Sequence, residues 1–427
     1  MKGSMIIRKI ALFLIFSILF IFCFSCTTKT THTNASSKDQ AKKYNLKVAL
    51  FPWIPDSAND DFESLKERLK KEFERRYPDI ELTLRLKKWD DSYYNPPKIA
   101  GWLASEKYDL VEIDTVILGD LISAEVIEPW LNQEASEFFT AAVQGSVVKD
   151  DGTITWWSVP HLLCGFFIVS KSYDIDSATT ISELNNAVIE IGKPIFGNFD
   201  SSWDLPSLYL DSLIDNGMNR TQAAEALEPP LNPKGLAALR NFASFCNFDG
   251  SNPCTNGQFD DNWNDPVLKF LSGEAVGYWG YSERLHFTVS ELKKAELPTD
   301  DLRVNTIPLG DNTIPLLFTD SFVKRVGCAE DPSCSNSVEA FINFINSDWA
   351  NEEILLSGDA KASGVTGVPR YLLPAKKSAF NIEGIKEDHL YKELKPYAEA
   401  GIAMPNTSSM YEKRKLMEWL IINQLPQ

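Results

Sequence analysis

The sequence predicts an α/β protein built from two lobes, and three observations indicate this fold. The chain has 427 residues, which is more than a single hydrophobic core usually serves. Hydrophobic residues make up 44% of it and 11 residues are tryptophan, so the chain can build a large core. Apolar runs typical of strands alternate with segments of helical spacing, which is the pattern of an α/β sheet.

Residues 1–25 are predicted to be an export signal. Basic residues precede the apolar run from Ile10 to Phe24, and this run is shorter than the about 20 residues that a transmembrane helix needs. Cys26 follows in a sequence that resembles a bacterial lipoprotein box, which predicts lipidation of Cys26 and membrane anchoring. Ordinary signal-peptidase cleavage nearby is the alternative. Residues 26–45, rich in Thr, Ser and Lys, are expected to form a flexible tether.

A strand–helix–strand unit opens the folded part. Leu46 to Phe51 is predicted as its first strand, and Ile80 to Leu86 alternates apolar and polar residues as a second strand. The helix between them has Asp60 or Asp61 as its cap and ends at Pro78. Its apolar residues recur at helical spacing: Phe62, Leu65, Leu69 and Phe73.

Leu110 to Ile113 is predicted as the next strand, followed by a helix from Val116 to Val126. Asp114 stands between them, at the strand's carboxyl end. Ligands bind at this edge of open α/β sheets, so Asp114 is a candidate ligand contact, and a helix N-cap is an equally good interpretation.

The remaining segments predict the second lobe and the return of the chain. Thr153 to Lys171 is predicted as paired strands, and Ser182 to about Phe270 as mainly helical. Gly273 to Gly280 is predicted as a turn into a buried strand that places Glu283 just beyond its end. Helices from Ser337 to Asn346 and at the C-terminus complete the fold. We therefore assign residues 46–160 and 285–375 to lobe 1, and residues 161–284 and 376–427 to lobe 2 with the C-terminal helices.

One cysteine is left without a local partner. Of the seven cysteines, Cys23 and Cys26 belong to the export segment. Short turn-rich loops allow two disulfides in an oxidising compartment, Cys246–Cys254 and Cys328–Cys334. Cys164 remains, either as a small buried hydrophobic residue or as a nucleophile.

Charge and histidine content exclude several kinds of protein. The net charge of −17 argues against a nucleic-acid partner and suits a cationic small molecule. The chain has four histidines, no HExxH spacing, and no CxxC spacing outside the export segment, so no metal site is expected. His161 lies three residues before Cys164, on the opposite face of an extended segment, which argues against a Cys–His dyad.

The export signal, the opening unit and the interleaved lobes resemble the type II periplasmic binding proteins, which hold a ligand in a cleft between two lobes. Several segments resemble bacterial thiaminase I more closely, and they follow the same order along the chain. These segments are Val159–Cys164, Ser207–Asp215, Gly280–Glu283, Leu316–Asp320 and Tyr371–Ala375.

In thiaminase I a cysteine attacks the pyrimidine of thiamin, a glutamate acts as base, and an outside amine or thiol displaces the thiazole. The resemblance implies that Cys164 is the nucleophile and Glu283 the general base. It implies further substrate contacts at Asp114, Asp320, Tyr281, Phe51, Trp53 and one of Tyr93 or Tyr94, with Tyr93 assigned. It implies no cofactor, and we expect a monomer. The chain departs from the family at Phe51 to Trp53, where tyrosines are usual, and at His161, where a neutral amide is usual.

Two other functions remain open at this stage. A lipid-anchored solute-binding protein would deliver thiamin, its pyrimidine or another ligand to a transporter, and would need neither Cys164 nor Glu283. A sugar-binding lipoprotein would use stacking tryptophans, for which the candidates are Trp156, Trp157, Trp203 and Trp263.

Overall fold

The computed structural model describes residues 43–426 except 52, 88–90, 132, 151, 200 and 261. The predicted signal at residues 1–25, Cys26 and the tether up to residue 42 lie outside the described residues. Lys42–Gln427 forms one compact unit. None of the described helices combines the length and the apolar character needed to span a membrane.

The predicted opening unit is confirmed. β1 (Tyr44–Ala49) and β2 (Ile80–Arg85) pair in parallel, and α1 (Glu63–Arg76) connects them. The predicted cap at Asp60 or Asp61 is wrong, because the N-cap residue of α1 is Phe62 and its side chain makes no capping hydrogen bond. The Asp60 carboxylate instead reaches into the first turn, where it accepts the backbone N–H of Ser64. The helix buries the predicted apolar face: Leu65, Leu69 and Phe73.

The main sheet has the strand order β2-β1-β3-β11-β7-β9-β8. β3 (Leu110–Asp114) runs parallel to β1, whereas β11 (Leu316–Arg325) is antiparallel to both β3 and β7 (Val159–Ser170). The remaining strands of this sheet are β4 (Ile127–Glu128), β8 (Ile195–Phe196), β9 (Gly277–Tyr281), β10 (Arg303–Thr306), β12 (Leu373–Pro374) and β13 (Ile402–Ala403). β7 links the two ends of the sheet, because it pairs with β11 along one part of its length and with β9 along another.

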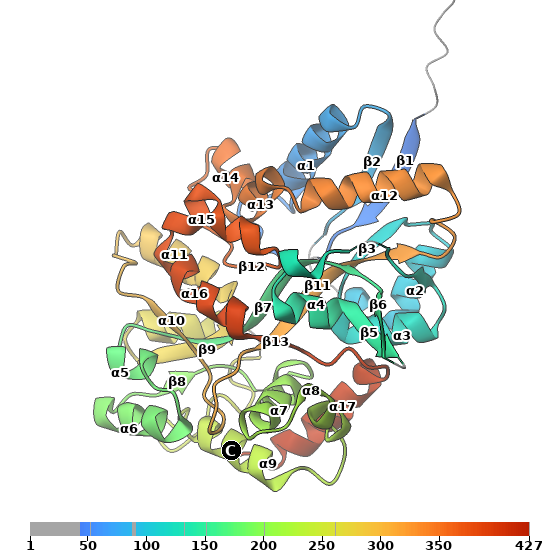
Figure 1. Cartoon of the computed structure of the whole chain (residues 1–427). Coiled ribbons are helices and arrows are strands. Elements are labelled where there is room, and N and C mark those ends of the chain that lie inside the picture. The colour runs from blue at the N-terminus through green and yellow to red at the C-terminus, as the bar shows by residue number, and fades with distance from the viewer. Residues whose placement is uncertain are drawn as a thin grey trace, which may run out of the picture. The chain divides into compact units, whose positions relative to one another are not determined.

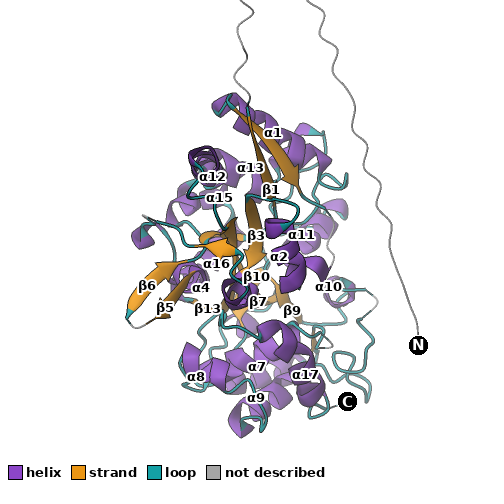
Figure 2. Cartoon of the chain, turned by 90° about the vertical axis from the view of Figure 1, so that its right-hand side faces the viewer, coloured by secondary structure: helices purple, strands orange, loops and turns teal. Residues whose placement is uncertain are grey.

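Helices cover the sheet at both of its ends. Figures 1 and 2 place α1 and α12 (Pro332–Ile345) at one end and α7 (Asp204–Asp215) with α9 (Pro233–Ser244) at the other. The helices of the first half are α2 (Pro96–Ala104), α3 (Leu118–Ser123), α4 (Thr140–Ser146), α5 (Tyr173–Asp176), α6 (Ile181–Ile191) and α8 (Arg220–Glu225). Those of the second half are α10 (Asp265–Leu271), α11 (Arg284–Lys294), α13 (Asp348–Leu355), α14 (Gly358–Ala362), α15 (Glu383–Glu387), α16 (His389–Ala400) and α17 (Met410–Ile422).

Some predicted elements differ from the observed ones. The strands predicted within Thr153 to Lys171 do not pair with each other: β6 (Thr153–Trp156) pairs with β5 (Val147–Asp150) in a separate sheet, and β7 joins the main sheet. The predicted helix from Val116 to Val126 is a 3-10 turn, Thr115–Ile117, followed by the short α3. The boundary assigned between residues 160 and 161 falls inside β7, and it stays a prediction.

The structure contains both expected disulfides. Cys246 is bonded to Cys254 and Cys328 to Cys334, while Cys164 is free and buried. Disulfides of this kind fit an oxidising compartment.

Candidate active site

Cys164 lies in the middle of the sheet, on β7, where its register partner on β11 is Phe318. Its side chain is 5% exposed. Burial, and then the neighbouring charges of Glu283, Asp320 and Asp114, raise the pKa of the Cys164 thiol well above its usual range. The thiol is therefore protonated at neutral pH and needs a base before it can act as a nucleophile.

Asp114 and Asp320 bring two carboxyl groups to one position. They are register partners in the antiparallel pair of β3 and β11, and both are buried. Burial raises the pKa of Asp114 to about 7, and burial with the charge of Asp114 raises the pKa of Asp320 well above its usual range. Two such carboxyl groups do not ionise together readily, so the pair retains a proton.

Asp114 caps a helical turn, which is one of the two interpretations that the sequence left open, and its contact with a ligand stays a prediction. One carboxylate oxygen accepts the backbone N–H of Val116 at 2.9 Å, which caps the following 3-10 turn. The other accepts the hydroxyl of Tyr94 at 3.1 Å, within the acidic cluster. The cap fixes the orientation of the carboxylate beside Cys164.

Glu283 follows β9 directly and occupies the N-cap position of α11. Burial raises the pKa of its carboxyl group to about 7, against the opposing effect of Arg284. A carboxyl group with this pKa is partly ionised at neutral pH and can accept a proton. Its charge is also the largest electrostatic influence on the Cys164 thiol, so the structure brings together the predicted nucleophile and base.

The structure places Tyr94, rather than the assigned Tyr93, at the acidic cluster. The Tyr94 ring packs against Trp203 with centroids 4.3 Å apart, and its hydroxyl donates to Asp114. Tyr93 is fully buried and packs edge-on against Trp102 with centroids 4.9 Å apart. The two tyrosines are adjacent in the 3-10 turn Asp91–Tyr94, and no feature of the sequence distinguishes them.

Tyr281 is positioned by a residue that the sequence analysis missed. Its hydroxyl donates to Asp204 at 2.7 Å, and its ring packs on Phe166 with centroids 4.3 Å apart. Asp204 is the first residue of α7, and burial raises the pKa of its carboxyl group to about 6. Aspartate is common in the first turn of a helix, so the sequence gives no sign that Asp204 contacts Tyr281.

Phe51 and Trp53 lie in the loop after β1, and each packs against another aromatic side chain. The Phe51 ring lies edge-on to Tyr94, with centroids 5.7 Å apart. Trp53 is half-buried and lies edge-on to Trp263, with centroids 6.1 Å apart. Trp263 precedes α10, so this contact joins two segments that are distant in sequence.

His161 contacts a carboxylate. The register between β7 and β11 shifts so that Leu162 and Pro160 oppose the consecutive residues Asp320 and Ser321, which makes His161 the extra residue of a β-bulge. Its Nδ1 lies 2.5 Å from the Glu112 carboxylate, and both side chains are 1% exposed. This contact agrees with the expectation that His161 does not form a dyad with Cys164.

Aromatic side chains around the candidate site pack against one another. A cavity of about 30 Å³ remains between residues that include Phe166, Asp204, Trp263, Tyr281 and Arg284. Cys164, Glu283, Asp114 and Asp320 are not among the residues that line this cavity.

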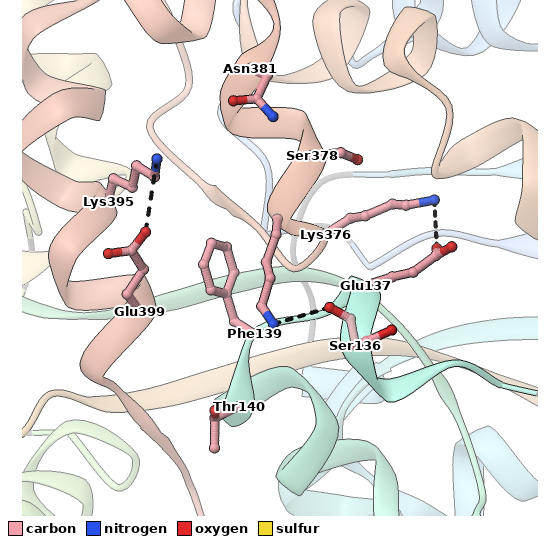
Figure 3. Close-up of a pocket in the computed structure, with 10 residues that line it drawn as sticks. Ser136, Glu137, Phe139, Thr140, Lys376, Ser378, Asn381, Lys395 and Glu399 are labelled. Carbon is pink, nitrogen blue, oxygen red and sulfur yellow. Dashed lines mark hydrogen bonds and ion pairs between the residues drawn. The ribbon is translucent and has the colours of Figure 1, made fainter.

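A larger hollow, of about 850 Å³, lies elsewhere (Figure 3). None of the predicted site residues lines it. Its Lys376 pairs with Glu137 at 2.8 Å, and its Lys395 pairs with Glu399 at 3.8 Å. Among the described residues, no group of three or more His, Cys, Asp or Glu side chains is placed to hold a metal ion.

The fold and this cluster define a class of protein: a two-lobed protein of the type II periplasmic-binding-protein-like fold, with a buried thiol beside a carboxyl group of near-neutral pKa. Comparison with known proteins is more specific. The chain is 23% identical over 376 residues to Thiaminase-1 of Paenibacillus thiaminolyticus, covering 84% of this chain and 82% of that protein. No family model matches the chain.

Solved structures agree with the sequence comparison. Clostridium botulinum thiaminase I in complex with thiamin superposes with a TM-score of 0.66 at 19% identity, covering 88% of this chain and 99% of that one. The GacH receptor of Streptomyces glaucescens superposes with a TM-score of 0.61 at 13% identity, covering 90% and 93%. The predicted fold class and the resemblance to thiaminase I are thus confirmed.

Proposed function

We propose that the chain is a thiaminase I-like transferase, which cleaves thiamin by replacing its thiazole with an amine or thiol. The observation that carries the proposal is the pair of Cys164 and Glu283, a buried thiol beside a carboxyl group with a pKa of about 7. The likeness to a curated thiaminase over most of both chains supports the prediction of an enzyme.

In the proposed reaction, the Glu283 carboxylate takes the proton of the Cys164 thiol, and the thiolate forms a covalent bond with the pyrimidine ring. The bond between the pyrimidine's methylene carbon and the thiazole nitrogen then breaks, and its electron pair leaves with the thiazole. Glu283 then releases this first proton to solvent, and it takes a second proton from the outside nucleophile as that nucleophile bonds to the methylene carbon. As the ring recovers, the cysteine leaves as a thiolate and takes this second proton back from Glu283, so that one proton is released for each thiazole displaced. Cys164 thus provides covalent catalysis and Glu283 provides general base catalysis.

The carboxyl groups of Asp114 and Asp320 are proposed to hold the aminopyrimidine. A pair that retains one proton can donate a hydrogen bond to a ring nitrogen and accept one from the amino group. Tyr94 and Tyr281, with their hydroxyls fixed on Asp114 and Asp204, would present aromatic faces to the flat ring.

A solute-binding protein is the second candidate function, and the likeness to the GacH receptor favours it. Both functions require a cleft that closes on a ligand. Only the enzyme requires a free thiol beside a base.

The decisive experiment incubates the purified protein with thiamin and a small amine or thiol and measures free thiazole. We expect release that depends on both partners, and a covalent adduct on Cys164 when the nucleophile is omitted. If thiamin or its pyrimidine binds reversibly, with no thiazole released and no adduct, the solute-binding function replaces the enzyme.

We also propose that the protein is exported and monomeric. The two disulfides are compatible with export. Lipidation of Cys26 rests on the sequence alone, and mass spectrometry of the N-terminal peptide from the native host tests it.

A further inference from the structure

A second cavity, of about 660 Å³, lies along α11. One wall is the loop at residues 56–59, and another is the segment at residues 365–368. The third wall is one side of α11, which contributes His286, Phe287, Lys293 and Lys294 among others. Its volume is within the usual range for small-molecule sites.

Two of the segments that line this cavity are adjacent in sequence to residues of the candidate active site. Trp53 lies three residues before the loop wall, and Glu283 immediately precedes α11. Glu283 has helical backbone angles, and its carbonyl accepts the N–H of His286 at 3.1 Å. Residues three and four apart on a helix are neighbours, so Glu283, His286 and Phe287 begin one helix face, which continues to Lys294. The cavity therefore begins about one helical turn beyond Glu283, at His286 and Phe287, and continues outward along the helix face on which Glu283 stands.

The chemistry of the cavity changes along its length. One turn beyond Glu283 the His286 ring is neutral, because burial lowers its pKa to about 4, and its Nδ1 donates to the carbonyl of Pro369 at 3.1 Å. The Asp56 carboxylate in the loop wall accepts the backbone N–H groups of Asp60 and Asp61. Phe287 adds an apolar surface. At the far end are Lys293 and Lys294, on a protein with a net charge of −17. Lys294 pairs with Glu291 at 2.7 Å, and no carboxylate among the described residues forms an ion pair with Lys293.

We propose that this cavity is the outer substrate chamber, and that Lys293 and Lys294 bind an anionic group on the molecule inside it. The inference rests on the proposed function. Because displacement takes place at one methylene carbon, the incoming nucleophile occupies the position that the thiazole leaves, and both use the same chamber. The anionic group is either a phosphate ester on the thiazole side of thiamin or an acidic group on the nucleophile.

The distances suit such molecules. Lys294 is eleven residues beyond Glu283, which corresponds to about 16 Å along the helix axis. Helical side chains lean toward the N-terminus, so the ammonium groups lie closer to Glu283 than their backbones do. A thiazole with its phosphorylated side chain, held at its pyrimidine by Cys164, extends in this direction.

The test compares neutral and anionic partners of equal reactivity. The substrates are thiamin and thiamin monophosphate, and the nucleophiles are 2-mercaptoethanol and 2-mercaptoethanesulfonate. For the substrates and for the nucleophiles separately, we divide kcat/KM for the anionic compound by kcat/KM for the neutral one. The double variant Lys293→Gln/Lys294→Gln should lower one of these two ratios about threefold to tenfold. The ratio that falls shows whether the anion is on the substrate or on the nucleophile. The preference should weaken with added salt. Lys392→Gln, an exposed lysine on α16 that does not line the cavity, should leave both ratios unchanged.

A binding measurement separates this inference from the proposed function. Cys164→Ser, with and without the two lysine substitutions, is titrated calorimetrically with the same neutral and anionic ligands. Absence of turnover with every substrate would overturn the proposed function, and the binding ratios would still decide on the chamber. If the double variant has the same two ratios as the protein with both lysines, in turnover or in binding, the chamber does not recognise an anion.

Discussion

Asp320 on β11 lies directly opposite Asp114 on β3, so two buried carboxyl groups from distant parts of the chain meet at one position in the sheet. Burial raises the pKa of both groups. Such groups give up solvation of their charged form when the protein folds. Ionisation of these groups therefore destabilises the empty folded protein to an extent that depends on pH. A cationic ligand would reduce this destabilisation.

Asp114→Asn should stabilise the empty protein at high pH. The folded pKa of Asp114, about 7, is above the unfolded value of about 3.9, so the folded state holds the proton more tightly and stability falls as pH rises between these values. Removing the charge should raise the free energy of unfolding by about 1–3 kcal/mol at pH 8 and much less at pH 5. Denaturant unfolding at both pH values measures this. The asparagine can still cap the 3-10 turn at Val116, and an equal gain at both pH values would contradict the titration of Asp114.

Cys164→Ser should abolish thiazole release and preserve thiamin binding. A serine hydroxyl is a far weaker nucleophile at neutral pH, and the substitution changes the volume of the β7 core little. We expect kcat to fall more than about 1,000-fold, with thiamin affinity within a fewfold of the wild type. Release assays and calorimetry measure the two quantities. Normal turnover by this variant would remove Cys164 from the mechanism.

Glu283→Gln should change both the rate and its pH dependence. In the wild type, kcat/KM should rise with pH up to about 7 as the Glu283 carboxyl group ionises, and then level off. The variant should be about 100- to 10,000-fold slower and should lose this acid limb. Its Cys164 thiol should also ionise at lower pH, because the charge of Glu283 raises the thiol's pKa. A variant that keeps the acid limb would show that another group is the base.

Tyr94→Phe and Tyr93→Phe form a matched pair, because the residues are adjacent and undergo the same change. Tyr94→Phe removes the hydrogen bond to Asp114 and should raise KM for thiamin about 3- to 10-fold, the usual effect of one hydrogen bond to a charged group. Tyr93→Phe should lower the melting temperature with little effect on KM, because the Tyr93 hydroxyl is buried and hydrogen-bonds with Arg85 rather than with the acidic cluster. The reverse pattern would support the assignment of Tyr93 as the substrate contact.

The success of the sequence-based predictions differs between elements for physical reasons. The β1-α1-β2 unit and the strand that delivers Glu283 were predictable because apolar periodicity and turn residues are local signals. Cys164 was found by elimination, since the other cysteines close short loops. Asp204 and Tyr94 could not be found in this way, because their roles depend on contacts with Tyr281 and Asp114, which only the folded chain brings near.

The reactivity of Cys164 should report whether the cleft opens in solution. The thiol is 5% exposed, and burial raises its pKa, so the native empty protein should react with iodoacetamide at pH 8 at least about 100-fold more slowly than a free thiol. Denaturation should restore the rate of an ordinary cysteine. Trp53→Ala removes one partner of the contact between Trp53 and Trp263, and should accelerate native labelling if separation of these walls admits ligands. Lys392→Gln is again the control, because its position on α16 is not part of the cleft. Fast labelling of the wild type would mean that the open form predominates when no ligand is bound.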